Sequence, residues 1–108
     1  MNKNIKIIRE LKNHLQHYYG SAIQEVILFG SQVTAAATVD SDVDVLIVLD
    51  KPHSKEDENR LLDLCYEIDL KYNILLDVHL LSKPELNTLR GKQPIYYNAL
   101  KNGVYAWL

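Results

Sequence analysis

Apolar residues along this chain follow two spacings, one typical of helices and one typical of strands. Between residues 4 and 19 they recur at steps of three and four, which predicts an amphipathic helix that ends at Gly20. Three segments rich in apolar and β-branched residues predict buried strands at residues 22–29, 42–50 and 74–81. We expect the third segment to be a central strand of the sheet.

Polar residues mark where two further helices begin. Ser54, with Asp57 three positions later, is typical of a helix start before an apolar face. Ser82, with Glu85 three positions later, predicts a second start, and Gly91 is expected to end that helix.

Two shorter helices are expected in the remaining segments. One covers residues 32–37 with Ser31 as its N-cap, and the other covers residues 94–102. Gly103 is expected to close the latter in a left-handed conformation, before a short strand at residues 104–107. Helices alternating with strands predict an α/β fold, a sheet with helices packed on it.

Composition limits the classes of protein to consider. The 108 residues, 47% hydrophobic and 24% charged, predict a single globular domain over residues 1–108. A net charge of −2 argues against direct nucleic-acid binding. The single cysteine, Cys65, excludes an internal disulfide framework, and no apolar run is long enough for a membrane span. We therefore expect a cytoplasmic protein without membrane contact.

Three aspartates are the strongest candidates for chemistry. Asp42 and Asp44 share one face at the start of the second predicted strand, and Asp77 lies between aliphatic residues in the third. If these two strands are neighbours, the three carboxylates converge, and they repel one another unless divalent cations lie among them. Oxygen ligands suit Mg²⁺ or Mn²⁺, and two such ions about 3.5–4 Å apart are typical of phosphoryl transfer.

Each of these signals also has a plainer explanation. Asp42 alone is typical of a turn, and Asp77 would be harmless on an edge strand that faces water. Gly30–Ser31 follows the first predicted strand and fits a simple strand-to-helix turn, although its amides and hydroxyl could equally receive phosphate oxygens.

Histidines and tyrosines leave further alternatives open. His14 and His17 lie three residues apart on the first predicted helix, where a solvated face is favoured over a metal site. His79 shares a strand face with Asp77, so it either orients a metal ligand or the acceptor, or packs in the core. The seven tyrosines, together with the apolar C-terminal residues, fit either helix-end packing or the surface of a homo- or hetero-oligomer.

Taken together, the motifs resemble a known superfamily. Gly30–Ser31 after a buried strand, Asp42-x-Asp44 opening the next strand and Asp77 in the third resemble the nucleotidyltransferase superfamily of DNA polymerase β. The stretch FGSQVTAAATVDSDVDVLIVL is similar to the minimal nucleotidyltransferases, the antitoxin partners of HEPN-domain toxins. The resemblance extends over most of the chain and implies the polymerase β-like nucleotidyltransferase fold, an α/β fold with a mixed sheet packed with helices.

The resemblance also implies roles for these residues. Gly30 and Ser31 would bind the nucleotide triphosphate, and Asp42 and Asp44 would bridge two Mg²⁺ or Mn²⁺ ions. Asp77 would hold the catalytic ion and help to deprotonate the acceptor hydroxyl. The implied activity is transfer of AMP from ATP to a tyrosine of a HEPN toxin.

One departure from the family pattern affects both activity and affinity. The family usually has an arginine soon after the serine, whereas residues 32–36 here are Gln, Val, Thr, Ala and Ala. We therefore predict that the isolated chain binds ATP weakly, which a dissociation constant in the low micromolar range would contradict. The rival interpretation is an inactive antitoxin that neutralises its HEPN partner by binding alone. The sequence leaves the nucleotide preference, the acceptor residue and the physiological metal undetermined.

Overall fold

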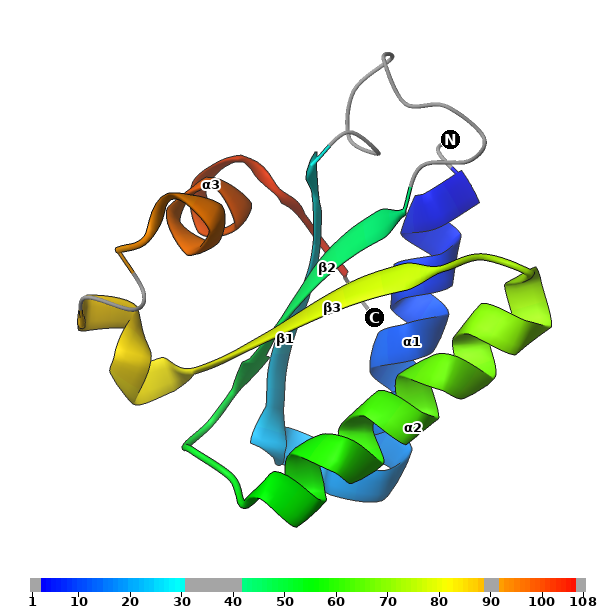
Figure 1. Ribbon diagram of the computed structural model, residues 1–108, viewed down its shortest axis with the longest axis horizontal. Coiled ribbons are helices and arrows are strands. Elements are labelled where there is room, and N and C mark those ends of the chain that lie inside the picture. The colour runs from blue at the N-terminus through cyan, green and yellow to red at the C-terminus, as the bar shows by residue number, and fades with distance from the viewer. Residues whose placement is uncertain (1–2, 31–41, 89–91, 107–108) are drawn as a thin grey trace.

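A four-stranded mixed sheet lies between two long helices on one face and a short helix on the other (Figure 1). The computed structural model describes residues 3–30, 42–88 and 92–106, to which every structural statement below refers. The elements in chain order are α1 (Lys3–Tyr19), η1 (Gly20–Ala22), β1 (Ile23–Phe29), β2 (Val43–Leu49), α2 (Lys55–Tyr72), β3 (Leu76–Ser82), η3 (Lys83–Asn87), α3 (Pro94–Asn102) and β4 (Val104–Tyr105).

The strand order in the sheet is β3-β2-β1-β4. β1 pairs antiparallel with both β2 and β4, whereas β2 and β3 run parallel. The parallel register places Asp44 directly opposite Asp77, and the antiparallel register places Phe29 opposite Asp44. The fold class expected from the alternation of helices and strands is therefore confirmed, with a sheet of mixed direction.

Alternation of side chains along the strands divides the core into two layers. One layer packs β1 and β2 against α1 and α2, and its buried helix residues are Ile7, Ile8, Leu11 and Leu15 of α1 and Leu61, Leu64, Cys65 and Ile68 of α2. The other layer is smaller and packs Phe29, Leu46 and Leu81 against Tyr96 and Ala99 of α3. Asp44 and Asp77 alternate with residues of the first layer and therefore face the side of the sheet that α3 covers (Figure 1).

The polar helix signals act locally as the sequence predicts. The Ser54 hydroxyl accepts a hydrogen bond from the Asp57 amide at 3.1 Å and caps α2. At Ser82 and Glu85 the side chains form a reciprocal capping box, but the helix that follows is the short 3₁₀ helix η3. The predicted end at Gly91, the predicted helix at residues 32–37 and the last two residues lie outside the described residues.

Two sequence predictions are wrong in informative ways. β3 is an edge strand of the described sheet rather than a central one, because β2 covers only one of its sides. Gly103 is not left-handed but has φ −74°. A Cβ atom at Gly103 would collide with the Ala99 carbonyl oxygen and the Ile27 side chain, so this position requires glycine for close packing.

No helix among the described residues combines the length and the apolar character that crossing a membrane requires.

Candidate functional site

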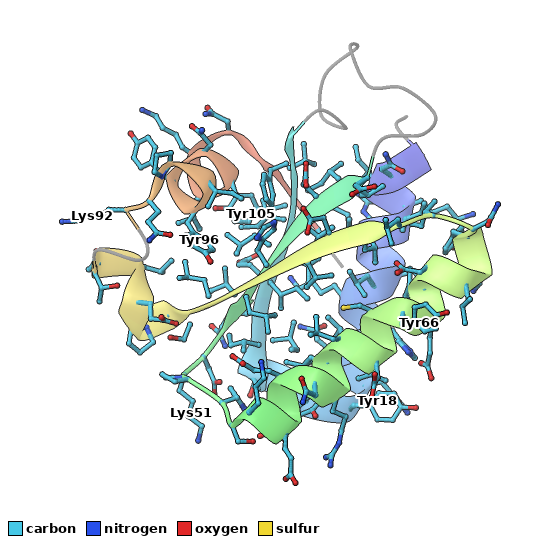
Figure 2. All side chains as sticks on the ribbon, in the orientation of Figure 1. Tyr18, Lys51, Tyr66, Lys92, Tyr96 and Tyr105 are labelled. Carbon is cyan, nitrogen blue, oxygen red and sulfur yellow. The ribbon has the colours of Figure 1, made fainter. Side chains whose placement is uncertain are left out.

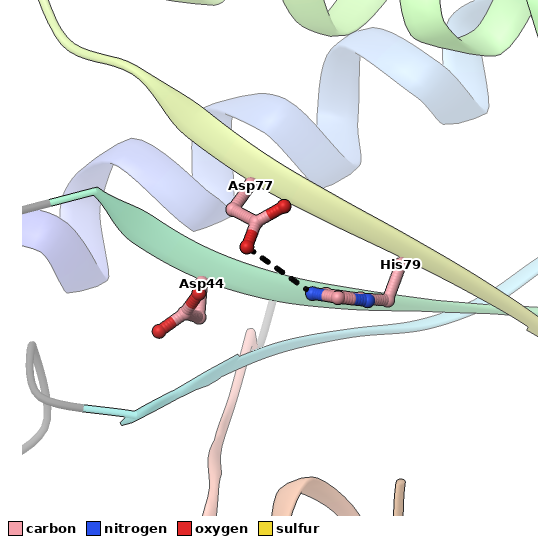
Figure 3. Close-up of side chains that lie close together, drawn as sticks. All are labelled: Asp44, Asp77 and His79. Carbon is pink, nitrogen blue, oxygen red and sulfur yellow. Dashed lines mark ion pairs between the residues drawn. The ribbon is translucent and has the colours of Figure 1, made fainter. Parts of the chain in front are cut away.

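Three side chains that can bind a metal ion gather on the α3 face of the sheet (Figure 3). Asp44 comes from β2, and Asp77 and His79 come from β3. One ligand atom of each lies within 4.8 Å of those of the other two. The register of the parallel strands brings the group together, because Asp44 is the pairing partner of Asp77. His79 lies on the same face as Asp77 because side chains two residues apart in a strand point to the same side of the sheet.

The imidazole of His79 lies on the more buried side of this group. Its Nε2 lies 3.4 Å from Oδ2 of Asp77, and the His79 side chain is 22% exposed against 51% for Asp77. The ring also packs against Phe29 and Tyr96, with centroids 5.6 Å and 6.5 Å away. Asp77 is therefore open to an incoming ligand, whereas His79 is held from behind by two aromatic rings.

The electrostatic state of Asp44 reflects its crowded position. Burial raises the pKa of Asp44 above its ordinary value, and a side-chain hydrogen bond to Asp77 and the charge of Asp77 raise it further. Asp42 adds a smaller effect in the same direction, and His79 opposes it. The negative charge of ionised Asp44 is therefore not fully balanced by its neighbours, and a bound cation would balance it.

The backbone of Gly30 lies directly against the Asp44 carboxylate at the end of β1. Gly30 has φ +75°, a conformation that side-chain-bearing residues rarely adopt. A Cβ atom built at this position would overlap Oδ2 of Asp44. Glycine is therefore required here twice, for the backbone turn and for the space that the carboxylate occupies.

The donor set fits a divalent cation. Two neighbouring carboxylates repel each other, and Nε2 of His79 is buried without a hydrogen-bond partner among the described residues. A buried polar atom that lacks a partner is unusual and calls for a specific explanation, such as an ion. Asp44, Asp77 and His79 would supply two oxygen donors and one nitrogen donor to such an ion.

Comparison with known proteins places this arrangement in a family. The family model of the nucleotidyltransferase domain matches residues 8–106. The chain belongs to this nucleotidyltransferase family. A Methanocaldococcus jannaschii protein described as a "putative protein adenylyltransferase" is 33% identical over 98 residues, covering 91% of this chain and 92% of that protein. A second protein of that organism with the same description is 32% identical over 72 residues, covering 67% of this chain and 73% of its own length.

Not all of the site residues predicted for this nucleotidyltransferase domain gather in one place. Asp44 and Asp77 are adjacent, and Gly30 touches Asp44. Asp42 is exposed just before β2 and is not part of the group that the three ligand atoms form. Ser31 lies outside the described residues.

The reason that sequence analysis gave for Asp77 is wrong, although the residue does lie in the acidic group. Asp77 was expected among aliphatic residues of a central strand, with an edge strand that faces water as the alternative. The alternative is observed, since Asp77 is half-exposed on an edge strand. For His79, the packing alternative is observed, since its ring lies against Phe29 and Tyr96. Its Nε2 also lies beside Asp77, and a role in orienting a metal ligand or the acceptor stays a prediction. The spacing Asp-x-His on one strand was the available signal.

The other histidines do not form a comparable group. Nε2 of His14 lies 2.5 Å from Oε2 of Glu67 on α2, and the His14 and His17 rings both pack edge-on against Tyr18. His14 is thus half-buried and paired with an acidic residue, whereas His17 is exposed. Among the described residues, the group with three possible metal ligands is Asp44, Asp77 and His79.

The tyrosines divide between the two alternatives that the sequence left open (Figure 2). Tyr96 is buried under the sheet, and the Tyr105 hydroxyl donates a hydrogen bond to the Leu100 carbonyl oxygen at 2.8 Å. Tyr18 and Tyr66 instead lie on the outer side of the two long helices and are 59% and 58% exposed. Packing therefore explains Tyr96 and Tyr105, and it also explains Tyr19 and Tyr72, which pack against the larger core layer. It does not explain the exposed rings of Tyr18, Tyr66 and Tyr97.

Proposed function

We propose that this chain transfers the AMP moiety of ATP to a hydroxyl group of another protein. The observation that carries the proposal is the pair of carboxylates, Asp44 and Asp77, level with each other on parallel strands and overlain by the glycine turn. The description of both archaeal relatives as protein adenylyltransferases supports a protein as the acceptor.

Each residue has a definite part in this proposal. Asp44 and Asp77 would hold the divalent metal, Mg²⁺ or Mn²⁺, and the exposed carboxylate of Asp42 would help Asp44 to hold a second ion. When bound, these ions supply positive charge to the triphosphate and to the reacting oxygens. Gly30, which has no side chain in the way, and Ser31 contact the triphosphate with backbone amides and a hydroxyl group.

The transfer itself is a displacement at phosphorus. The acceptor oxygen forms a bond to the α-phosphorus, the bond from that phosphorus to the bridging oxygen breaks, and pyrophosphate leaves. The proton of the acceptor hydroxyl passes to Asp77, whose side chain is 51% exposed and therefore accessible to a second protein.

We further propose that the acceptor protein is a HEPN-domain toxin and that this chain is its cytoplasmic antitoxin. The support is the sequence resemblance to minimal nucleotidyltransferases, which act beside such partners. The chain would work as one domain with ATP as its substrate.

The test is direct transfer to the product of the neighbouring gene. The full chain is incubated with Mg²⁺, ATP and that protein, and intact mass spectrometry detects the addition of one AMP. We expect Asp44→Asn and Asp77→Asn to abolish the addition, and Asp42→Asn to weaken or abolish it. Asp63→Asn, which changes an exposed carboxylate on α2, is the matched control and should react like the parent chain. Transfer that persists in both Asp44→Asn and Asp77→Asn would overturn the proposal.

The second candidate is an antitoxin that acts by binding alone. The specific observation in its favour is the lack of an arginine in residues 32–36, which leaves the triphosphate without that local positive charge. Under this alternative, the double variant Asp42→Asn/Asp44→Asn still protects cells from the toxin, and no AMP is found on the partner.

A further inference from the structure

We infer that His79 is itself a metal ligand and that it makes this site prefer a first-row transition-metal ion, Mn²⁺, over Mg²⁺. The inference rests on the proposed function, because it concerns the same metal site. It adds a nitrogen donor to a site that the motif alone describes as carboxylates only.

The position of Nε2 is the first argument. Donor atoms at neighbouring corners of an octahedral ion lie roughly 3 Å apart, and opposite corners roughly 4.2 Å apart, when the bonds are about 2.1 Å. Nε2 of His79 lies 3.4 Å from Oδ2 of Asp77, and the three donors of the group all lie within 4.8 Å of one another. Small side-chain adjustments would therefore bring one ion within bonding distance of all three donors.

The unsatisfied state of Nε2 is the second argument. The atom is buried and has no hydrogen-bond partner among the described residues, although a carboxylate oxygen is close to it. A nitrogen that only packed in the core would be expected to make a hydrogen bond, whereas among the described residues Nε2 has the longer ion-pair contact with Oδ2 of Asp77 instead. An ion held between Asp44 and Asp77 would satisfy this nitrogen and both carboxylates together.

The packing of the ring is the third argument. Phe29 lies at the end of β1, and Tyr96 is on α3, and their rings contact the imidazole at tilted and edge-on angles. Because the ring is fixed from two elements, Nε2 stays aimed at the carboxylates in the absence of any ion (Figure 3). Such preorganisation is what precise metal sites require of their supporting residues.

The preference for Mn²⁺ follows from ligand chemistry. Mg²⁺ takes oxygen donors and gives up its water reluctantly, whereas imidazole nitrogen is a good donor for transition-metal ions. A site of two carboxylates and one imidazole therefore binds Mn²⁺ more tightly than it binds Mg²⁺, and the nitrogen contributes to the difference.

The experiment compares metal binding by the nucleotide-free chain and by its variants. Mn²⁺ affinity is measured from the electron paramagnetic resonance signal of the free ion, and Mg²⁺ affinity by competition. Pulsed measurements on the bound Mn²⁺ detect a directly bonded ring nitrogen. His79→Phe keeps a ring between Phe29 and Tyr96 but removes the nitrogen, and His17→Phe removes an exposed imidazole from α1 as the matched control.

We expect His79→Phe to weaken Mn²⁺ binding about tenfold or more, to change Mg²⁺ affinity less than about twofold, and to abolish the nitrogen coupling. His17→Phe should leave all three measurements unchanged. Unchanged Mn²⁺ affinity in His79→Phe, or a bound Mn²⁺ without nitrogen coupling in the parent chain, would overturn the inference. If His79→Phe does not fold, as judged by circular dichroism, the nitrogen coupling in the parent chain decides alone.

Asp44→Asn separates the two proposals. If this variant loses Mn²⁺ while His79→Phe retains it, the acidic site stands and only the role of His79 is wrong. If Asp44→Asn binds Mn²⁺ as tightly as the parent chain, the metal site that the proposed function requires is wrong as well.

Discussion

Gly30 is the residue at which the backbone of β1 meets the side chain of Asp44. Two features disfavour any other residue at this position: the backbone φ is +75°, and a Cβ atom would overlap Oδ2 of Asp44. Gly20 is left-handed too, with φ +56°, but a Cβ there would have no neighbour within 4 Å. Replacing either glycine strains the backbone, but only a side chain at Gly30 would also displace the Asp44 carboxylate. Comparing variants at the two positions therefore distinguishes the two effects.

We predict that Gly30→Ala and Gly20→Ala each lower the free energy of unfolding by about 1 kcal/mol, because alanine is strained at positive φ. Only Gly30→Ala should also weaken Mn²⁺ binding, by at least about tenfold, since its methyl group pushes the Asp44 carboxylate aside. Urea unfolding and metal titration measure the two effects. Equal metal affinity in the two variants would show that the Asp44 contact has no role in binding.

The raised pKa of Asp44 predicts that the ionised carboxylate, which the proposed metal site needs, destabilises the metal-free fold. In the folded protein this carboxyl binds its proton more tightly than in the unfolded chain, where the ordinary value is 3.8. The stability of the metal-free protein therefore falls as the pH rises from 3.8 through the raised folded-state pKa of Asp44.

In a chelating buffer at pH 7, we expect Asp44→Asn to raise the melting temperature by about 2 °C, a small effect because the carboxylate pair is partly solvated. Added Mn²⁺ should stabilise the parent chain but not the variant. Thermal unfolding followed by circular dichroism checks both, with Asp63→Asn as the control. A metal-free Asp44→Asn that melts below the parent chain would mean that the carboxylate stabilises the fold.

At the scale of elements, most helices and strands follow from local spacing. The Ser54 cap and the buried face of α2 agree with the periodicity because a helix buries every third or fourth residue whatever lies opposite. The place of β3 in the sheet does not follow from local spacing. The largely apolar segment 74–81 suits a central strand, but it also suits an edge strand that has one face packed against helices. In β3, Val78 and Leu80 face the α1–α2 layer, while Asp77 and His79 face the other side.

Gly103 connects α3 to β4, and its closeness to neighbouring elements explains why sequence analysis misjudged it. A left-handed helix end is the common reason for glycine after a helix. Here the backbone is extended, and a side chain would meet the Ala99 carbonyl oxygen, the Ile27 side chain and the Leu28 carbonyl oxygen. The requirement comes partly from the preceding turn of α3 and partly from β1, a distant part of the chain.

Gly103→Ala is therefore expected to lower the free energy of unfolding by about 2 kcal/mol through overpacking. Asn102→Ala, at the exposed neighbouring position, should change it by less than about 0.5 kcal/mol. Urea denaturation of both variants provides the comparison. A Gly103→Ala variant as stable as the parent chain would show that α3 can move away from β1 without loss.

At the scale of the whole molecule, the larger core layer closes around Cys65. The side chain is 2% exposed, and burial, with a smaller effect from the charge of Asp69, raises the pKa of Cys65 to about 12. The thiol therefore reacts only when the α1–α2 layer opens.

We predict that a disulfide reagent at pH 8 labels Cys65 at least about a thousandfold more slowly in the native chain than in urea, as expected for opening linked to global unfolding. Ile47→Ala, at a fully buried position in the same layer, should speed the labelling while leaving the α3 face intact. The labelling rate is followed by absorbance. Rapid labelling of the native parent chain would contradict a closed core around α2.

The sequence by itself determined the main helices, the extent of the strands, and the candidates Asp42, Asp44 and Asp77, because spacing and local hydrogen bonding act between near neighbours. Only the tertiary structure decided which candidates meet. The parallel pairing of β2 and β3 set Asp44 beside Asp77, the edge position left Asp77 half-exposed, and the turn of β1 brought Gly30 onto Asp44. These contacts join residues far apart in the chain, so their geometry depends on strand order and register, which periodicity does not specify.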